Sequence, residues 1–158
     1  MDDNTLEGVI ASTEIWTPLS TTEFSRIAIG NAEDVTFLEV FYKMIEAEDF
    51  PSRKDDQDHL IHPLTVTHFL QKAKTPFLDQ AAGMLHDYIE ELVDDSAEIF
   101  GFEMPRDVEL LGGLEEQLLW GLREDLVDLF PKRGVYKGMA DKLIGVVDLV
   151  TRHKRENY

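Results

Sequence analysis

Apolar residues recur at intervals of three and four positions along most of the chain, and this spacing limits its fold more than any other feature. A stripe with that period covers one side of an α-helix, so each such segment is expected to bury one helical face. Period-two alternation, which would indicate β-strands, is not convincing anywhere, and no internal repeat is visible. We therefore predict an all-α helical bundle.

Prolines and glycines divide this pattern into separate helices. The predicted helices run from Asn31 or Asp34 to Pro51, from Pro63 to Thr75, over about 76–99, from Leu114 to Pro131, and from about residue 137 onward. Gly101, Pro105 and the Gly112–Gly113 pair are expected in loops. The second helix is predicted to bury Val66, Phe69, Leu70 and Ala73. Before these helices, a short helix could start at Ser20–Thr22, in a mixed segment that we interpret as an arm, residues 1–33.

Charge and composition exclude several classes of protein. The net charge of −17 disfavours nucleic-acid binding, which needs clustered Lys and Arg. An acidic chain can still bind a phosphate if a cation or a few basic side chains focus positive charge locally. Cysteine is absent, which excludes disulfides and thiolate metal sites. The N-terminus does not resemble a signal peptide and no apolar run reaches 18 residues, so we expect a cytoplasmic protein without membrane contact.

The segment 81-AAGMLHDYIEEL-92 stands apart from this core pattern. On one continuous helix, His86, Asp87, Glu90 and Glu91 would share a side, since residues three and four apart are neighbours. Imidazole and carboxylate together suit divalent ions such as Mn, Fe or Zn. A lone His-Asp pair is more often simply solvated. His62 raises the odds of a metal site, because an antiparallel helix pair could bring it back to the His-Asp pair, whereas His68 is expected to be a structural or surface residue.

These residues form a recognisable joint motif. Arg53-Lys54, His62-Pro63-Leu64, the run from Ala81 to Asp87 and the segment 146-VVDLVTRHKRENY-158 fall in one register. In this register the chain resembles the HD-superfamily hydrolase domain of RelA/SpoT-type (p)ppGpp hydrolases, most specifically over 53–92. The resemblance implies an HD-domain helical bundle over residues 34–158.

The resemblance also implies roles for individual residues. His62, His86 and Asp87 match the metal ligands, with manganese favoured as the metal. Glu90 and Glu91 match the acidic pair that orients or activates the attacking water. On the substrate side, the matches are Arg53, Lys54 and His59, the last at the position of a nucleobase-contacting Tyr. The implied activity is metal-dependent hydrolysis of a small-molecule nucleotide phosphate similar to (p)ppGpp. The alternative is a catalytically incomplete HD-fold module for regulation or binding.

Departures from the family pattern keep that alternative open. Position 91 carries Glu where the family has Asp, and the loop after Lys54 is rich in acid. The family's fourth ligand is an Asp on a late helix. Asp141 and Asp148 are candidates for it, and the third option is that the chain lacks both this ligand and the last helix. The basic cluster 152–155 either complements a helix C-terminus or forms a rim that faces phosphate.

Overall fold

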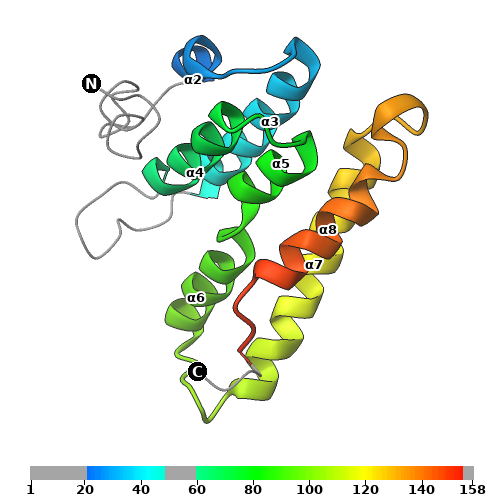
Figure 1. The fold of residues 1–158 in the computed structure, drawn as a ribbon. Helices are drawn as coiled ribbons and strands as arrows, with labels where there is room; N and C mark the ends of the chain where they lie inside the picture. Colours follow the sequence, from blue (N-terminus) through cyan, green and yellow to red (C-terminus); the bar gives the residue numbers. More distant parts are fainter. Residues whose placement is uncertain (1–20, 49–59, 155–158) are drawn as a thin grey trace. The chain divides into compact units, whose positions relative to one another are not determined.

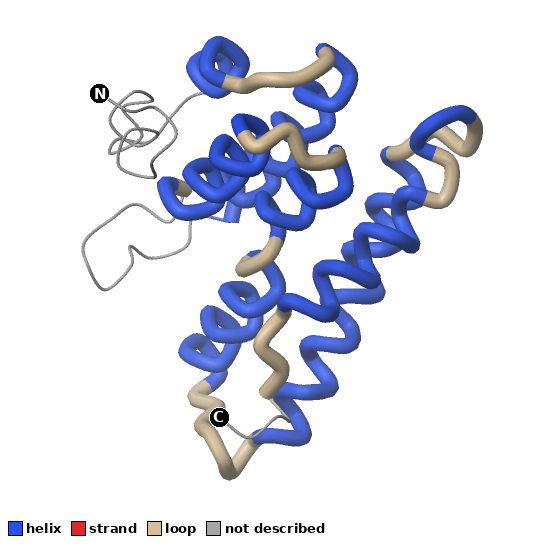
Figure 2. Tube along the Cα trace, in the orientation of Figure 1, coloured by secondary structure: helices blue, strands red, loops and turns tan. Residues whose placement is uncertain are grey.

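The computed structural model describes residues 21–48 and 60–154. All regular structure in these two ranges is helical (Figure 2), which confirms the all-α prediction. None of the described helices is both long enough and apolar enough to cross a membrane.

The chain divides into two compact units, residues 1–85 and 86–158. The first unit contains helices α2 (Thr21–Ile27), α3 (Ala32–Glu48), α4 (Ile61–Lys72) and α5 (Phe77–Leu85), as Figure 1 shows. The second unit contains helices α6 (Tyr88–Phe100), α7 (Val108–Leu129) and α8 (Met139–Val150), with a 3-10 turn, η1 (Gly134–Tyr136), before the last. The boundary that we predicted after residue 33 differs from the boundary between these two units. The interpretation of residues 1–33 as an arm stays a prediction.

Helix α3 begins as the sequence predicts. The side-chain oxygen of Asn31 accepts a hydrogen bond of 2.8 Å from the backbone N–H of Asp34, which satisfies one of the free donors of the first turn. Helix α2 packs on α3 through Phe24 and Tyr42, whose parallel rings lie 5.9 Å apart and are fully buried. Such a pair contributes about 0.5–1.5 kcal/mol beyond its buried area. This contact holds a helix of only seven residues in place.

Helix α4 buries a different face from the predicted one. Of the predicted stripe, Phe69 is 42% exposed and Ala73 is also exposed. Besides the apolar Ile61 and Leu64, the buried side carries four polar residues: Thr65, Thr67, His68 and Gln71. The prediction was wrong because it assigned polar residues to solvent, although a buried polar group is tolerated once it is hydrogen-bonded.

The buried polar groups of α4 find most of their hydrogen bonds within the helix itself. The hydroxyls of Thr65 and Thr67 each donate to the carbonyl oxygen four residues earlier, at 2.7 Å. The Nδ1 atom of His68 lies in hydrogen-bond contact with Oε1 of Gln71, at 3.3 Å, and the same oxygen accepts from the backbone N–H of Ile29. Nε2 of Gln71 is buried without a hydrogen-bond partner among the described residues, so most but not all of the buried polar groups of α4 are satisfied.

Helices α4 and α5 approach each other closely at Gly83. A Cβ atom at this position would lie 2.6 Å from Cδ1 of Leu70 and 3.1 Å from Cγ1 of Val66. Both distances are shorter than ordinary van der Waals contact. A side chain at position 83 would therefore have to push α4 away or force its side chains to rotate.

The predicted helix over 76–99 is two helices. Helix α5 ends at Leu85 and α6 begins at Tyr88, with a two-residue turn at His86-Asp87. Asp87 has φ −99° and ψ −3°, in the sparsely populated region between helix and strand. Periodicity does not reveal the break, since the apolar spacing continues across it.

Helix α7 is longer than the sequence predicts. It runs through Gly112 and Gly113, which we expected in a loop. Two glycines in a helix interior cost about 1 kcal/mol each relative to alanine. The 22-residue helix offsets this cost through its buried side, which carries Leu111, Gly112, Glu115, Leu119, Leu122 and Leu126.

The segment after α8 is fastened to the rest of its unit by polar contacts. Thr151 donates its hydroxyl proton to the carbonyl oxygen of Val147, at 2.6 Å. Lys154 donates its backbone N–H to Oε1 of Glu115 on α7, at 2.7 Å, and its Nζ contacts Oδ1 of Asp94 on α6, at 2.5 Å. Part of the basic cluster 152–155 is thus paired with acidic side chains of the same unit.

Candidate metal centre

His62, His86 and Asp87 form a group that could hold a metal ion. One ligand atom of each residue lies within 4.8 Å of the other two. His62 lies in the first turn of α4, and the other two residues directly follow the last residue of α5. Since α4 packs against α5, the spacing of the group depends on this helix pair and on the peptide bond after Leu85.

The side chain of Asp87 does not cap helix α6, although its position would allow it to. Asp87 immediately precedes α6, where an aspartate usually accepts a hydrogen bond from the first turn. Here it makes no such bond. Its Oδ2 lies 3.1 Å from Nε2 of His86 instead. The carboxylate and the imidazole are therefore held together at the turn, both partly buried.

The three ligand atoms lie slightly further apart than they would around a bound divalent ion. Two ligand atoms that each lie about 2.1 Å from one ion are at most about 4.2 Å apart. The observed spacing of up to 4.8 Å exceeds this by a few tenths of an ångström. Small side-chain rotations would close the group around an ion.

Glu90 and Glu91 lie in the first turn of α6 and outside this three-residue group. Burial raises the pKa of the Glu90 carboxyl above its usual range, and the nearby charges of Asp87 and Asp94 raise it further. Acidic side chains at this point also interact favourably with the helix dipole. That dipole gives the pair a structural role even without any chemistry.

The residues predicted to bind substrate lie outside the described ranges, whereas His68 lies within them. Arg53, Lys54 and His59 lie outside the described residues. His68 is buried on α4, and burial lowers the pKa of its imidazole, with a smaller lowering contribution from the charge of Lys72. A buried, hydrogen-bonded imidazole on the core side of a helix is a structural residue, in line with our expectation for His68.

Both candidates for a fourth ligand make other contacts. Asp141 accepts a hydrogen bond of 2.8 Å from Nε of Arg123. Asp148 lies 2.8 Å from Nε2 of His153 through its Oδ1. Neither belongs to the group formed by the two histidines and Asp87.

A second polar site was not predicted from the sequence. Helices α7 and α8 and the segment after them line a cavity of about 510 Å³, whose walls include Glu115 and Trp120. The feature of the sequence that could have pointed to it is Trp120 in a leucine-rich segment, and in the structure this side chain is 62% exposed.

No family model matches the chain, and neither does any curated protein or solved structure. The assignment of the site therefore rests on the residues themselves.

Proposed function

We propose that the chain is a divalent-metal-dependent phosphohydrolase that acts on a nucleotide phosphate, with His62, His86 and Asp87 as metal ligands and manganese as the metal. The observation that carries the proposal is the convergence of two imidazoles and one carboxylate at the start of α4 and the end of α5. This donor set suits Mn, Fe or Zn.

The residues around the group have distinct roles in this proposal. When bound, such an ion supplies an activated water and polarises a phosphoryl oxygen. Glu90 and Glu91, in the first turn of α6, orient the attacking water and accept its proton. Arg53, Lys54 and His59 bind the phosphate and the base of the nucleotide, as the resemblance implies. Three protein ligands are the number typical of catalytic rather than structural sites.

The first experiment is a manganese titration of the purified chain by calorimetry. We expect about one ion per chain. His86→Ala and Asp87→Ala should each weaken binding by more than about 100-fold, because the loss of a direct ligand exceeds the roughly 10–100-fold effect of losing a residue that only hydrogen-bonds to a ligand. Glu98→Gln is the matched control, since this exposed acid on α6 lies two turns further along the helix. Unchanged manganese binding in both His86→Ala and Asp87→Ala would contradict the assignment of these residues as metal ligands.

The second experiment tests turnover. We expect phosphate or pyrophosphate release from a panel of guanosine and adenosine polyphosphates with added manganese. Glu90→Gln and Glu91→Gln should lose turnover while they retain the metal. Loss of metal binding in these variants would instead make them ligands.

A second candidate is the catalytically incomplete module. It is favoured by the contacts of Asp141 and Asp148 with Arg123 and His153, because the family that the chain resembles has a fourth Asp ligand and neither candidate for it belongs to the group. Tight metal binding without turnover on any nucleotide of the panel would support this module over the enzyme.

A further inference from the structure

We propose that the second unit, residues 86–158, binds a small organic cation in the cavity between α7 and α8. This inference is independent of the metal centre. At about 510 Å³ the cavity lies within the range of about 300–1,000 Å³ that is typical of small-molecule sites. All of its walls belong to one unit, and Figure 1 shows the two helices side by side.

Glu115 provides the buried charge of the cavity. Its side chain is 2% exposed. Oε1 accepts the hydrogen bond from the backbone of Lys154, whereas Oε2 makes no hydrogen bond with any residue in the described part of the chain. A buried carboxylate oxygen without a donor costs free energy. A ligand N–H that reached Oε2 would remove this cost.

His153 lies against this oxygen but does not satisfy it. Its Nδ1 is 3.2 Å from Oε2 of Glu115, within ion-pair distance but outside hydrogen-bond geometry. Its Nε2 contacts both the backbone oxygen and Oδ1 of Asp148, at 2.9 and 2.8 Å. Both of these atoms are acceptors, so a proton on Nε2 would be donated to Asp148. These contacts hold the imidazole against the end of α8, and Oε2 of Glu115 stays without a hydrogen-bond donor among the described residues.

The balance of charge in the lining favours a cation. Three carboxylates, from Glu115, Glu116 and Asp148, outnumber the guanidinium of Arg123 and one imidazole. Arg123 also directs its Nε to Asp141, which is not part of the lining. In a chain with a net charge of −17, this excess of acid gives the cavity a negative potential.

Trp120 and the apolar residues beside it determine which kind of ligand skeleton the cavity can accept. The exposed ring of Trp120 carries the guanidinium of Arg123 at 5.2 Å from its centroid, so a ligand cation would share this ring with Arg123 or displace it. Leu119 and Ile144 contribute apolar surface to the lining of the cavity. The ligand that fits these groups is an amine or amidinium on a small ring or a short aliphatic body.

Three ligands of similar shape but different charge test whether the cavity prefers a cation: benzamidine, benzamide and benzoate. The chain has two tryptophans, so Trp16→Phe leaves Trp120 as the only one. In this variant of the full chain, benzamidine should change the fluorescence saturably, with weaker binding at 500 mM than at 50 mM salt because salt screens the attraction. Benzamide should bind more weakly and benzoate most weakly. Equal or tighter binding of benzoate, or no saturable binding of benzamidine, overturns the proposal.

Substitutions locate the site. Glu115→Gln keeps the shape but removes the charge, and should weaken benzamidine binding by about tenfold, as expected for a hydrogen bond to a charged group. Asp125→Asn, an exposed acid on the same helix, is the matched control and should leave binding unchanged. If circular dichroism shows that Glu115→Gln does not fold, Asp148→Asn, whose side chain is 55% exposed, replaces it with the same expectation. A folded variant with unchanged affinity contradicts the inference, whereas His86→Ala should bind benzamidine normally.

Discussion

The helix pairs α4–α5 and α7–α8 are built from similar amphipathic segments but pack differently. In the first pair Gly83 lets the two helices meet so closely that an added Cβ would clash with Leu70. In the second pair a cavity of about 510 Å³ remains. Helix α7 also contains glycines, at 113 and 121, but a Cβ there would meet nothing within 4 Å. The approach of two helices is therefore set by where a glycine faces its neighbour and not by how many glycines a helix has.

The largest expected effect is on the core of the closer pair. Leu64→Ala in α4 should lower the free energy of unfolding by about 2–5 kcal/mol, because Leu64 is fully enclosed and its loss leaves a void. Leu119→Ala at the wall of the α7–α8 cavity should cost less than Leu64→Ala, because this side chain already borders empty space. Urea unfolding measures both. Equal losses would contradict the difference in packing.

Glycine substitutions should change stability in opposite directions in the two pairs. Gly83→Ala gains about 1 kcal/mol of helix propensity but adds overpacking of about 1–3 kcal/mol, so we expect net destabilisation. Gly113→Ala gains the same propensity with no clash and should stabilise by up to about 1 kcal/mol. Thermal unfolding of the two variants tests this. Gly83→Ala should also weaken manganese binding, since it displaces α4 from α5; a stabilised variant with full affinity would show that the close approach is not needed.

Acid should weaken the first pair through His68. Its folded-state pKa is lowered by burial, so the unfolded chain binds more protons as the pH falls below about 6.5. The stability that His68 contributes is thus full above that pH and is lost as the pH falls toward the folded-state pKa. We expect the wild type to lose more stability than His68→Gln between pH 7.5 and 5.5, measured by urea unfolding at each pH. Parallel losses in the two proteins would remove His68 as the cause.

The smallest effect concerns the polar contacts that fasten the last segment to the second unit. Asp94→Asn removes the ion pair with Lys154, whose partner carboxylate is more than half exposed, and should cost no more than about 1 kcal/mol. The cost should shrink further in high salt. Asp95→Asn, its neighbour on α6, serves as the control. A larger or salt-independent loss would mean that this contact holds the unit together.

The sequence predicted the helical architecture because apolar periodicity follows directly from helix geometry. It also identified His62, His86 and Asp87, which the structure brings into one group. It failed where tertiary contacts override local pattern. The buried polar face of α4 and the helical Gly112 both depend on neighbours that a single segment does not reveal.

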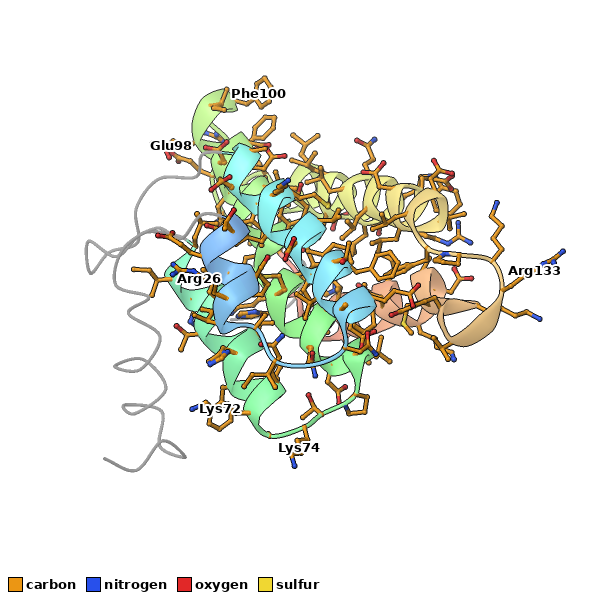
Figure 3. All side chains as sticks on the ribbon, turned by 90° about the horizontal axis from the view of Figure 1, so that it is seen from above. Arg26, Lys72, Lys74, Glu98, Phe100 and Arg133 are labelled. Atoms are coloured by element: carbon orange, nitrogen blue, oxygen red, sulfur yellow. The ribbon has the colours of Figure 1, made fainter. Side chains whose placement is uncertain are left out.

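The α7–α8 cavity could not be predicted for a similar reason. In the sequence, Glu115 is one acid among several on α7, and only the folded unit buries it beside His153. Exposure does not follow from residue type alone either. Phe100, at the end of α6, and Arg133, in the loop before α8, both extend away from the ribbon in Figure 3, although one is apolar and the other charged.

The hydroxyls of Thr65, Thr67 and Thr151 have a consequence for how this protein can change over evolutionary time. Each donates its proton to a carbonyl oxygen of its own helix, so none depends on a polar group of a neighbouring helix. The side chains that face these threonines therefore need not supply a polar partner, and they are free to drift as long as their volume is conserved.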